Sequence, residues 1–146
     1  MKGLVWFRRD LRLHDNPALS AACKECKEIV PLFVFDEPLL RDHLFGSACV
    51  GFMLGCLEEL RRSLAEQGVT LVWRMGEPID TMLRTAQECA VDAVYWNRDY
   101  EPSAVVRDRT VQQRLVQQGR LVRTFKDHVV FEAEEVRGLT GDPFQR

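Results

Sequence analysis

The chain lacks the phosphate-binding motifs that several nucleotide-binding folds carry. The segment after its first apolar run, RRDLRLHDN, contains no glycine, so the GxGxxG turn of a dinucleotide-binding domain is absent. No GxxxxGK[ST] run occurs in the sequence, which excludes a P-loop NTPase. The third apolar run ends in RMGEP, without the aspartate that a response-regulator receiver domain needs there.

Histidine is scarce, and the charge is nearly balanced. His14, His43 and His128 are far apart and have no convincing serine or cysteine partner for nucleophilic catalysis. With 20 basic and 22 acidic residues, the formal net charge of −2 disfavours a protein that grips nucleic acid by charge alone. No apolar run approaches the ~20 residues that span a bilayer, and no signal peptide is recognisable. The sequence therefore predicts a cytoplasmic protein.

The five cysteines do not form a disulfide framework, because their number is odd and their spacing is scattered. We expect reduced thiols, in keeping with a cytoplasmic protein. The pair Cys23-x-x-Cys26 has no second ligand pair, so no metal site is predicted. One core cysteine and one surface cysteine on a helix are the preferred interpretation.

Short β-rich runs alternate with longer helical ones. The strand candidates cover residues 3–7, 29–35, 70–75, 93–96 and 121–125, and helices are expected to begin near residues 16, 47, 77 and 102. This alternation predicts an α/β fold, a Rossmann-like, doubly wound five-stranded parallel sheet with helices on both faces. The pattern is lost after residue 126, which predicts a domain over 1–126 and a tail or linker over 127–146.

Two loops carry charge to the edge where such sheets bind ligands, outside the carboxyl ends of the strands. The RRDLR turn follows the first strand, and a salt-bridge cluster within the turn is slightly favoured over direct ligand contact. Asp99 and Glu101 follow the fourth strand. They either accept hydrogen bonds from a polycyclic ligand or stabilise the start of the next helix, and the two interpretations weigh about equally. Trp73 and Trp96 are expected in the core.

The segment WFRRDLRLHDNPAL resembles the first strand and helix of the DNA photolyase/cryptochrome family. LFVFDEP, GCLEELRRSLAEQG, YWNRDYEP and TGDPF continue the resemblance in order, so that it covers essentially the whole chain. It implies the family's N-terminal α/β domain, which holds an accessory light-harvesting chromophore. By the same resemblance, FAD and the pyrimidine dimer belong to a following helical domain that is absent here, and residues 127–146 start the linker toward it.

The resemblance also implies the residues of the chromophore site. Asp99 and Glu101 match positions that contact the antenna in deazaflavin-type members. Cys49, on the second helix, stands where those members tend to carry an arginine. Ser103 and Ala104 stand where folate-type members favour Asn-Glu, so a deazaflavin or flavin antenna is expected over folate, with no antenna as a further option. The implied site residues are Arg8, Arg9, Phe35, Asp36, Cys49, Asp99 and Glu101.

The expected function is the antenna domain of a deoxyribodipyrimidine photolyase, a blue-light-driven DNA repair lyase for pyrimidine dimers. The alternative is a stand-alone nucleotide- or flavin-binding module, or a cryptochrome-like photoreceptor fragment without repair activity. No catalytic residue is assigned, because the chain by itself is expected to be catalytically incomplete. Damaged DNA would be contacted only through the helical domain, no membrane is involved, and the isolated chain is expected to form a homodimer unless its tail covers the exposed face.

Overall fold

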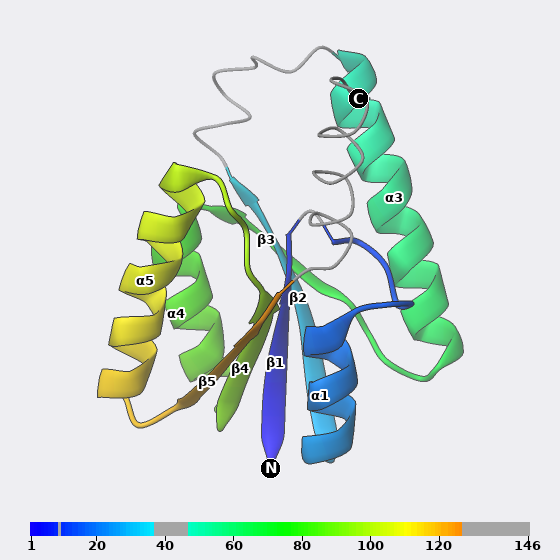
Figure 1. The fold of residues 1–146 in the computed structure, drawn as a ribbon. Helices are drawn as coiled ribbons and strands as arrows, with labels where there is room; N and C mark the ends of the chain where they lie inside the picture. The colour runs from blue at the N-terminus through cyan, green and yellow to red at the C-terminus, as the bar shows by residue number, and fades with distance from the viewer. Residues whose placement is uncertain (9, 37–46, 127–146) are drawn as a thin grey trace, which may run out of the picture.

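Five parallel strands form one sheet at the centre of the computed structural model, which describes residues 1–8, 10–36 and 47–126 (Figure 1). The strands lie in the order β3-β2-β1-β4-β5, and every neighbouring pair is parallel. The elements are β1 (Lys2–Phe7), α1 (Pro17–Glu25), β2 (Glu28–Asp36), α3 (Ser47–Glu66), β3 (Val72–Gly76), α4 (Pro78–Glu88), β4 (Ala93–Asn97), α5 (Pro102–Gln117) and β5 (Leu121–Phe125). The predicted fold class is confirmed.

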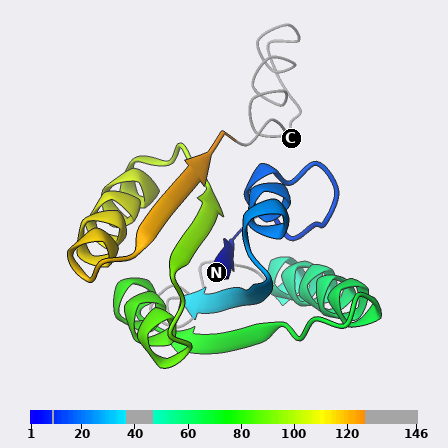
Figure 2. The same cartoon turned by 90° about the horizontal axis from the view of Figure 1, so that it is seen from below.

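Helices cover both faces of the sheet (Figure 2). On one face, α1 and α3 pack against β1, β2 and β4 through a core that includes Val5, Phe7, Phe33, Leu60 and Tyr95. On the other face, α4 and α5 enclose a second core that includes Leu4, Trp6, Met82, Trp96 and Val111. The side chains of β1 alternate between the two cores because successive residues of a strand point to opposite faces.

Helix starts and stops follow local chemistry. The Asn16 side chain accepts a hydrogen bond from the Leu19 backbone N–H at 3.1 Å, and Pro17 opens α1. Glu77 caps α4 in the same way through the Asp80 N–H at 2.9 Å. Gly68 adopts a left-handed φ of 78° just after α3, where most other residues would be strained.

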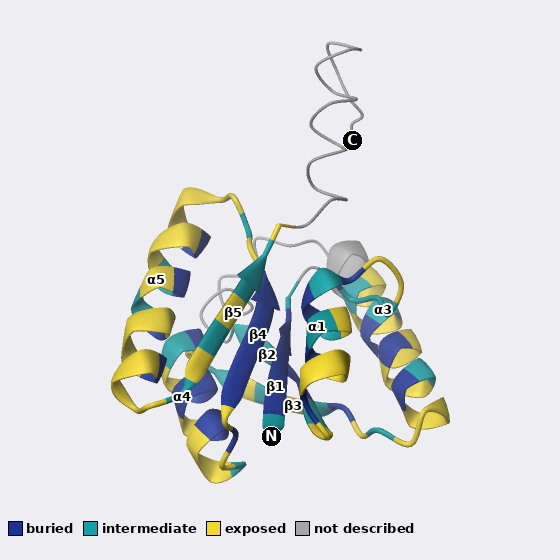
Figure 3. Ribbon diagram, turned by 60° about the horizontal axis from the view of Figure 1, so that its bottom comes forward, coloured by how far each residue is buried: buried dark blue, intermediate teal, exposed yellow. Residues whose placement is uncertain are grey.

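The edge strands are only half covered, in contrast to β1 and β4, which are buried along almost their whole length (Figure 3). Trp96 is buried as expected, but the expectation for Trp73 is wrong, since that residue is 58% exposed. Trp73 lies on β3, the last strand of the sheet on that side, and contacts Phe35 of β2 edge to face at 5.6 Å between ring centroids. An edge position leaves the outer side of an indole without a neighbouring strand.

The strand order reverses direction between β1 and β4. From β1 the chain first moves outward through β2 and β3, and then crosses back to β4 and β5 on the other side. The carboxyl ends of β1 and β4 therefore diverge into different loops and leave a crevice, the usual ligand position in such sheets. Within the described ranges, no helix is both long enough and apolar enough to cross a membrane.

Candidate functional site

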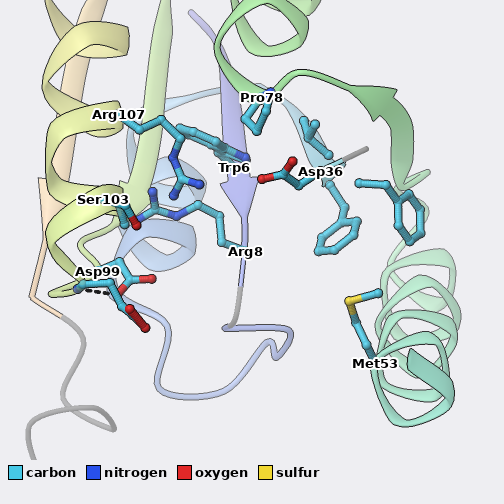
Figure 4. Close-up of a pocket in the computed structure, with 13 residues that line it drawn as sticks. Trp6, Arg8, Asp36, Met53, Pro78, Asp99, Ser103 and Arg107 are labelled. Atoms are coloured by element: carbon cyan, nitrogen blue, oxygen red, sulfur yellow. Dashed lines mark hydrogen bonds between the residues drawn. The ribbon is translucent and has the colours of Figure 1, made fainter. Parts of the chain in front are cut away.

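A cavity of about 310 Å³ opens at the carboxyl edge of the sheet, where the strand order reverses (Figure 4). Its walls come from β1, β2, the segment after β4, and helices α3, α4 and α5. The volume lies at the lower end of the ~300–1,000 Å³ typical of small-molecule sites. The lining residues are Trp6, Arg8, Phe33, Val34, Phe35, Asp36, Met53, Pro78, Asp99, Glu101, Ser103, Ala104 and Arg107.

Most of the residues implied by the resemblance meet in this cavity. Arg8, Phe35, Asp36, Asp99 and Glu101 all line it, although they come from three separate segments of the chain. The remaining two cannot be placed. Residue 9 lies outside the described residues, and residue 49 belongs to α3 at a position whose side chain is not described.

The slightly favoured interpretation was a salt-bridge cluster within the turn, but Arg8 forms its ion pair with a residue far from the turn. Its Nη1 lies 2.5 Å from Oδ1 of Asp108 on α5, and its Nη2 donates to the backbone carbonyl of Asn97. Both side chains of the ion pair are largely buried, with 10% and 12% of their surface exposed. Within the described part of the turn, Arg8 therefore makes a long-range contact with α5.

A buried polar cluster fixes the turn beneath Arg8. Asp10 is only 7% exposed, and its carboxylate accepts hydrogen bonds from the Arg8 N–H at 2.9 Å and from the Asn97 side chain at 2.6 Å. The Asn97 amide also donates to Asn16 at 2.7 Å and accepts from the Ala18 N–H at 3.0 Å. Because each of these polar groups is paired, the cluster joins β1, α1 and β4 at low desolvation cost.

Two guanidinium groups flank the indole of Trp6. The Arg8 carbon Cζ lies 4.9 Å from the ring centroid and that of Arg107 lies 5.4 Å from it, within the range of cation–π contact. Neither Trp6 nor Arg107 was among the predicted site residues. Trp6 lies two residues before Arg8, and this spacing at the end of β1 could have indicated it. Arg107 lies one helical turn after Ser103, which lines the cavity but was not among the implied site residues, so the sequence held no comparable signal for it.

The acidic pair lies at the start of α5. The Asp99 carboxylate accepts a hydrogen bond from the Glu101 N–H at 3.1 Å, and Glu101 is the N-cap residue of α5 without a side-chain capping bond. Asp99 thus orders the approach to the helix, while Glu101 does not cap it in the usual way. Both interpretations of the pair keep some support, because both residues also line the cavity.

An apolar groove adjoins the cavity and shares Phe35 and Met53 with it. The groove has a volume of about 570 Å³ and lies over α3 and the edge strand β3. Its lining residues are Phe35, Met53, Leu54, Leu57, Glu58, Arg61, Leu71, Trp73 and Met75. Phe35 and Met53 therefore lie between the charged side of the cavity and an exposed apolar surface.

This arrangement suits a flat heterocycle with polar substituents. The aromatic and thioether side chains Phe35 and Met53 provide an apolar wall, and carboxylates on other walls can accept hydrogen bonds from N–H or hydroxyl groups. These residues fit a flavin-like chromophore. Within the described ranges, no group of three histidine, cysteine or acidic side chains could hold a metal ion.

A family model described as DNA photolyase matches residues 3–146. The chain is 33% identical over 141 residues to a deoxyribodipyrimidine photo-lyase of a Synechococcus species, covering 97% of this chain and 29% of that protein. It is 34% identical over 145 residues to cryptochrome-2 of Arabidopsis thaliana, covering 98% of this chain and 23% of that protein. The curated relatives that it matches are longer, since it spans between 21% and 50% of their length.

A solved structure of a family member has the same fold as this chain. The crystal structure of an archaeal photolyase from Sulfolobus tokodaii superposes with a TM-score of 0.80 and 32% identity, over 86% of this chain and 29% of that chain. The family match, the shared fold and the length ratio lead to one assignment. The chain belongs to the DNA photolyase and cryptochrome family and corresponds to the N-terminal α/β domain of its members.

Proposed function

We propose that this chain is the light-harvesting domain of a deoxyribodipyrimidine photolyase and binds an antenna chromophore in the cavity at the carboxyl edge. A deazaflavin or flavin is preferred over folate. The observation that carries the proposal is the convergence of Arg8, Phe35, Asp36, Asp99 and Glu101 on one cavity at the reversal of strand order. The similar Sulfolobus tokodaii photolyase is described as holding two FAD molecules, with a novel light-harvesting cofactor implied.

The domain assignment forms part of the same proposal. Residues 1–126 make up the chromophore-binding unit, and residues 127–146, which lie outside the described residues, lead toward a helical domain that holds FAD and damaged DNA. When bound, the chromophore would absorb light and pass the energy on. The residues of this chain would hold and orient it and keep water from its ring.

Titration of the purified chain with 5-deazariboflavin and FMN tests the proposal. An absorption band that remains with the protein after gel filtration is expected. Asp99→Ala and Glu101→Ala should each weaken binding by about 1–3 kcal/mol, because a polar group of the bound ligand loses its hydrogen-bond partner. Asp92→Ala is the matched control, since that carboxylate lies at the amino end of β4 and accepts from the Lys2 N–H at 2.9 Å.

The melting temperature separates the two interpretations of the acidic pair. Weaker binding with a nearly unchanged melting temperature supports ligand contact. Unchanged affinity together with a lower melting temperature would mean that Asp99 and Glu101 only stabilise the start of α5.

A cryptochrome-like photoreceptor is the second candidate. Cryptochrome-2 of Arabidopsis thaliana and a protein named blue-light photoreceptor PHR2 from the same plant match at 34% and 30% identity, close to the value for the photolyase relative. Illumination of damaged DNA with the chain alone and with a family helical domain supplied in trans distinguishes the candidates. The chain alone is expected to leave the dimers intact, and repair that depends on both parts would favour the photolyase.

A further inference from the structure

Arg107 presents a guanidinium group to the cavity with most of its donors unused. Its Nε lies 3.4 Å from Oδ1 of Asp108, a long contact, and its two terminal nitrogens donate to no other residue in the described part of the chain. The side chain is 26% exposed. A guanidinium group has five N–H donors in a planar fork, so at least the terminal groups are available to a ligand.

The carboxylate of Asp108 does not neutralise this wall. The same oxygen that lies 3.4 Å from Arg107 lies 2.5 Å from Arg8. One carboxylate therefore faces two guanidinium groups, and both groups lie over the ring of Trp6. Among Arg8, Arg107 and Asp108, this pairing leaves one positive charge in excess, at a partly buried position where screening by solvent is reduced.

The carboxylates on the other walls are already engaged. Asp99 accepts from the Glu101 N–H, and Asp36, Asp99 and Glu101 each have a further interaction. In Figure 4, Arg8 lies between Arg107 and the start of α5, where Asp99 is found. The guanidinium group of Arg107 and the acidic pair thus lie at different ends of the cavity.

We infer that Arg107 is a specificity-determining residue that selects a ligand in which a flat aromatic ring is joined to an anionic group such as phosphate. This inference rests on the proposed chromophore site and adds the charge of the ligand to it. The ring would lie toward Phe35 and Met53, the anionic group would meet the free fork of Arg107, and hydroxyl groups between them would face the acidic pair.

Riboflavin and FMN provide the probe, because they differ only by the phosphate. Calorimetric titration of the full chain is expected to give an affinity for FMN at least about tenfold higher than for riboflavin, the effect of one charge-assisted hydrogen bond. This ratio should fall as salt is added, since the anionic contact is partly screened.

Arg107→Gln should reduce the ratio of FMN to riboflavin affinity to about one. Arg107→Lys should keep part of the ratio because it retains the charge without the planar fork. Arg109→Gln is the matched control, since Arg109 lies two residues further along α5 in a different surface depression with Gln112 and Gln113. Melting temperatures of the three variants confirm that each is folded.

The outcomes separate the inference from the proposed function. Equal binding of riboflavin and FMN by the unmodified chain, or an FMN preference that survives Arg107→Gln, would overturn the role of Arg107 and leave the chromophore site standing. No binding of riboflavin, FMN or 5-deazariboflavin would overturn both.

Discussion

The ion pair between Arg8 and Asp108 joins the carboxyl end of β1 to the second turn of α5 in a largely buried position. Removing one partner of a buried pair leaves the other charge without compensation, and this costs more than the pair itself contributes. Arg8 would keep its bond to the Asn97 carbonyl but lose its counter-charge.

Asp108→Ala is therefore expected to lower the free energy of unfolding by about 3 kcal/mol or more, as measured by urea denaturation. The comparison is Glu88→Ala, which removes an exposed partner of Arg74 and should cost less than about 1 kcal/mol. Similar losses in the two variants would show that burial of the Arg8–Asp108 pair does not increase its effect on the free energy of unfolding.

Tyr95 is a second residue whose charge state is tied to folding. Its hydroxyl donates to Glu25 Oε1 at 2.6 Å and lies 3.4 Å from the Cys26 sulfur, and Glu25 in turn pairs with Arg123 at 3.2 Å. Burial raises the pKa of the Tyr95 hydroxyl above its ordinary value of 10.0, and the bonds with Cys26 and Glu25 raise it further. The folded protein therefore holds the phenol in its neutral form.

This shift predicts a loss of stability in alkali. The contribution is present in full well below pH 10, where Tyr95 is neutral in both states. As the pH rises above 10, the unfolded chain ionises first, so stability falls by up to about 1.4 kcal/mol per pH unit. Tyr95→Phe should reduce the slope of unfolding free energy against pH between 9.5 and 11, roughly the window in which an unfolded tyrosine titrates.

Tyr100→Phe is the control for this measurement, because Tyr100 is 45% exposed. It should keep the alkaline slope of the unmodified protein. A Tyr95→Phe variant with the unmodified slope would mean that other groups cause the alkaline loss.

At the level of elements, α1 approaches β1 so closely that only glycine fits at position 3. A Cβ atom on Gly3 would lie 2.6 Å from the Cys26 sulfur and 3.0 Å from Cε1 of Tyr95. These distances are shorter than van der Waals contact, and neither neighbour can move far, since Cys26 ends α1 and Tyr95 is buried in β4.

Gly3→Ala is expected to destabilise the protein by about 1–3 kcal/mol through overpacking. The double variant with Cys26→Ala should recover part of this loss, because the sulfur is the nearer obstacle. Urea denaturation of the two single variants and the double variant measures these losses. Additive losses in the double variant would contradict a direct clash.

The element pattern was largely predictable because local signals and tertiary packing agree in this chain. Asn16-Pro17 and Glu77-Pro78 begin helices as predicted, and Gly68 follows the end of another. Trp73 was misassigned because apolarity does not reveal whether a strand lies at the centre or at the edge of a sheet.

The site was predictable in part. Arg8, Asp99 and their neighbours on the strand ends follow from the position of loops in a parallel sheet together with the family resemblance. The partner of Arg8 could not be predicted, because Asp108 lies 100 residues away and no local pattern links the two. Arg107 was missed because its contact with Trp6 arises only when α5 packs beside β1.

At the scale of the whole molecule, we expect the apolar groove beside β3 to determine whether the isolated chain self-associates. Leu54, Trp73 and Met75 are 47%, 58% and 57% exposed and line the groove together. Exposed apolar side chains that lie together mark surfaces of association, but three of them are few beside the ~20–30 residues per side of a stable interface. Weak, concentration-dependent self-association is therefore expected.

Light scattering over a concentration series checks this expectation, with Trp73→Lys as the variant that should remain monomeric. Val106→Lys is the control, because Val106 is 63% exposed but belongs to α5 on the opposite face of the sheet. A monomer at every concentration in the unmodified chain would show that the groove does not drive association.

The separation of 100 residues between Arg8 and its carboxylate partner also sets an order of events during synthesis. At about 5–20 residues per second, the ribosome makes Asp108 roughly 5–20 s after Arg8. Until α5 emerges, the cavity lacks the wall that Ser103, Ala104 and Arg107 form. Chromophore binding would thus follow completion of the last helix. A bound chromophore would indicate a chain in which α5 has packed beside β1.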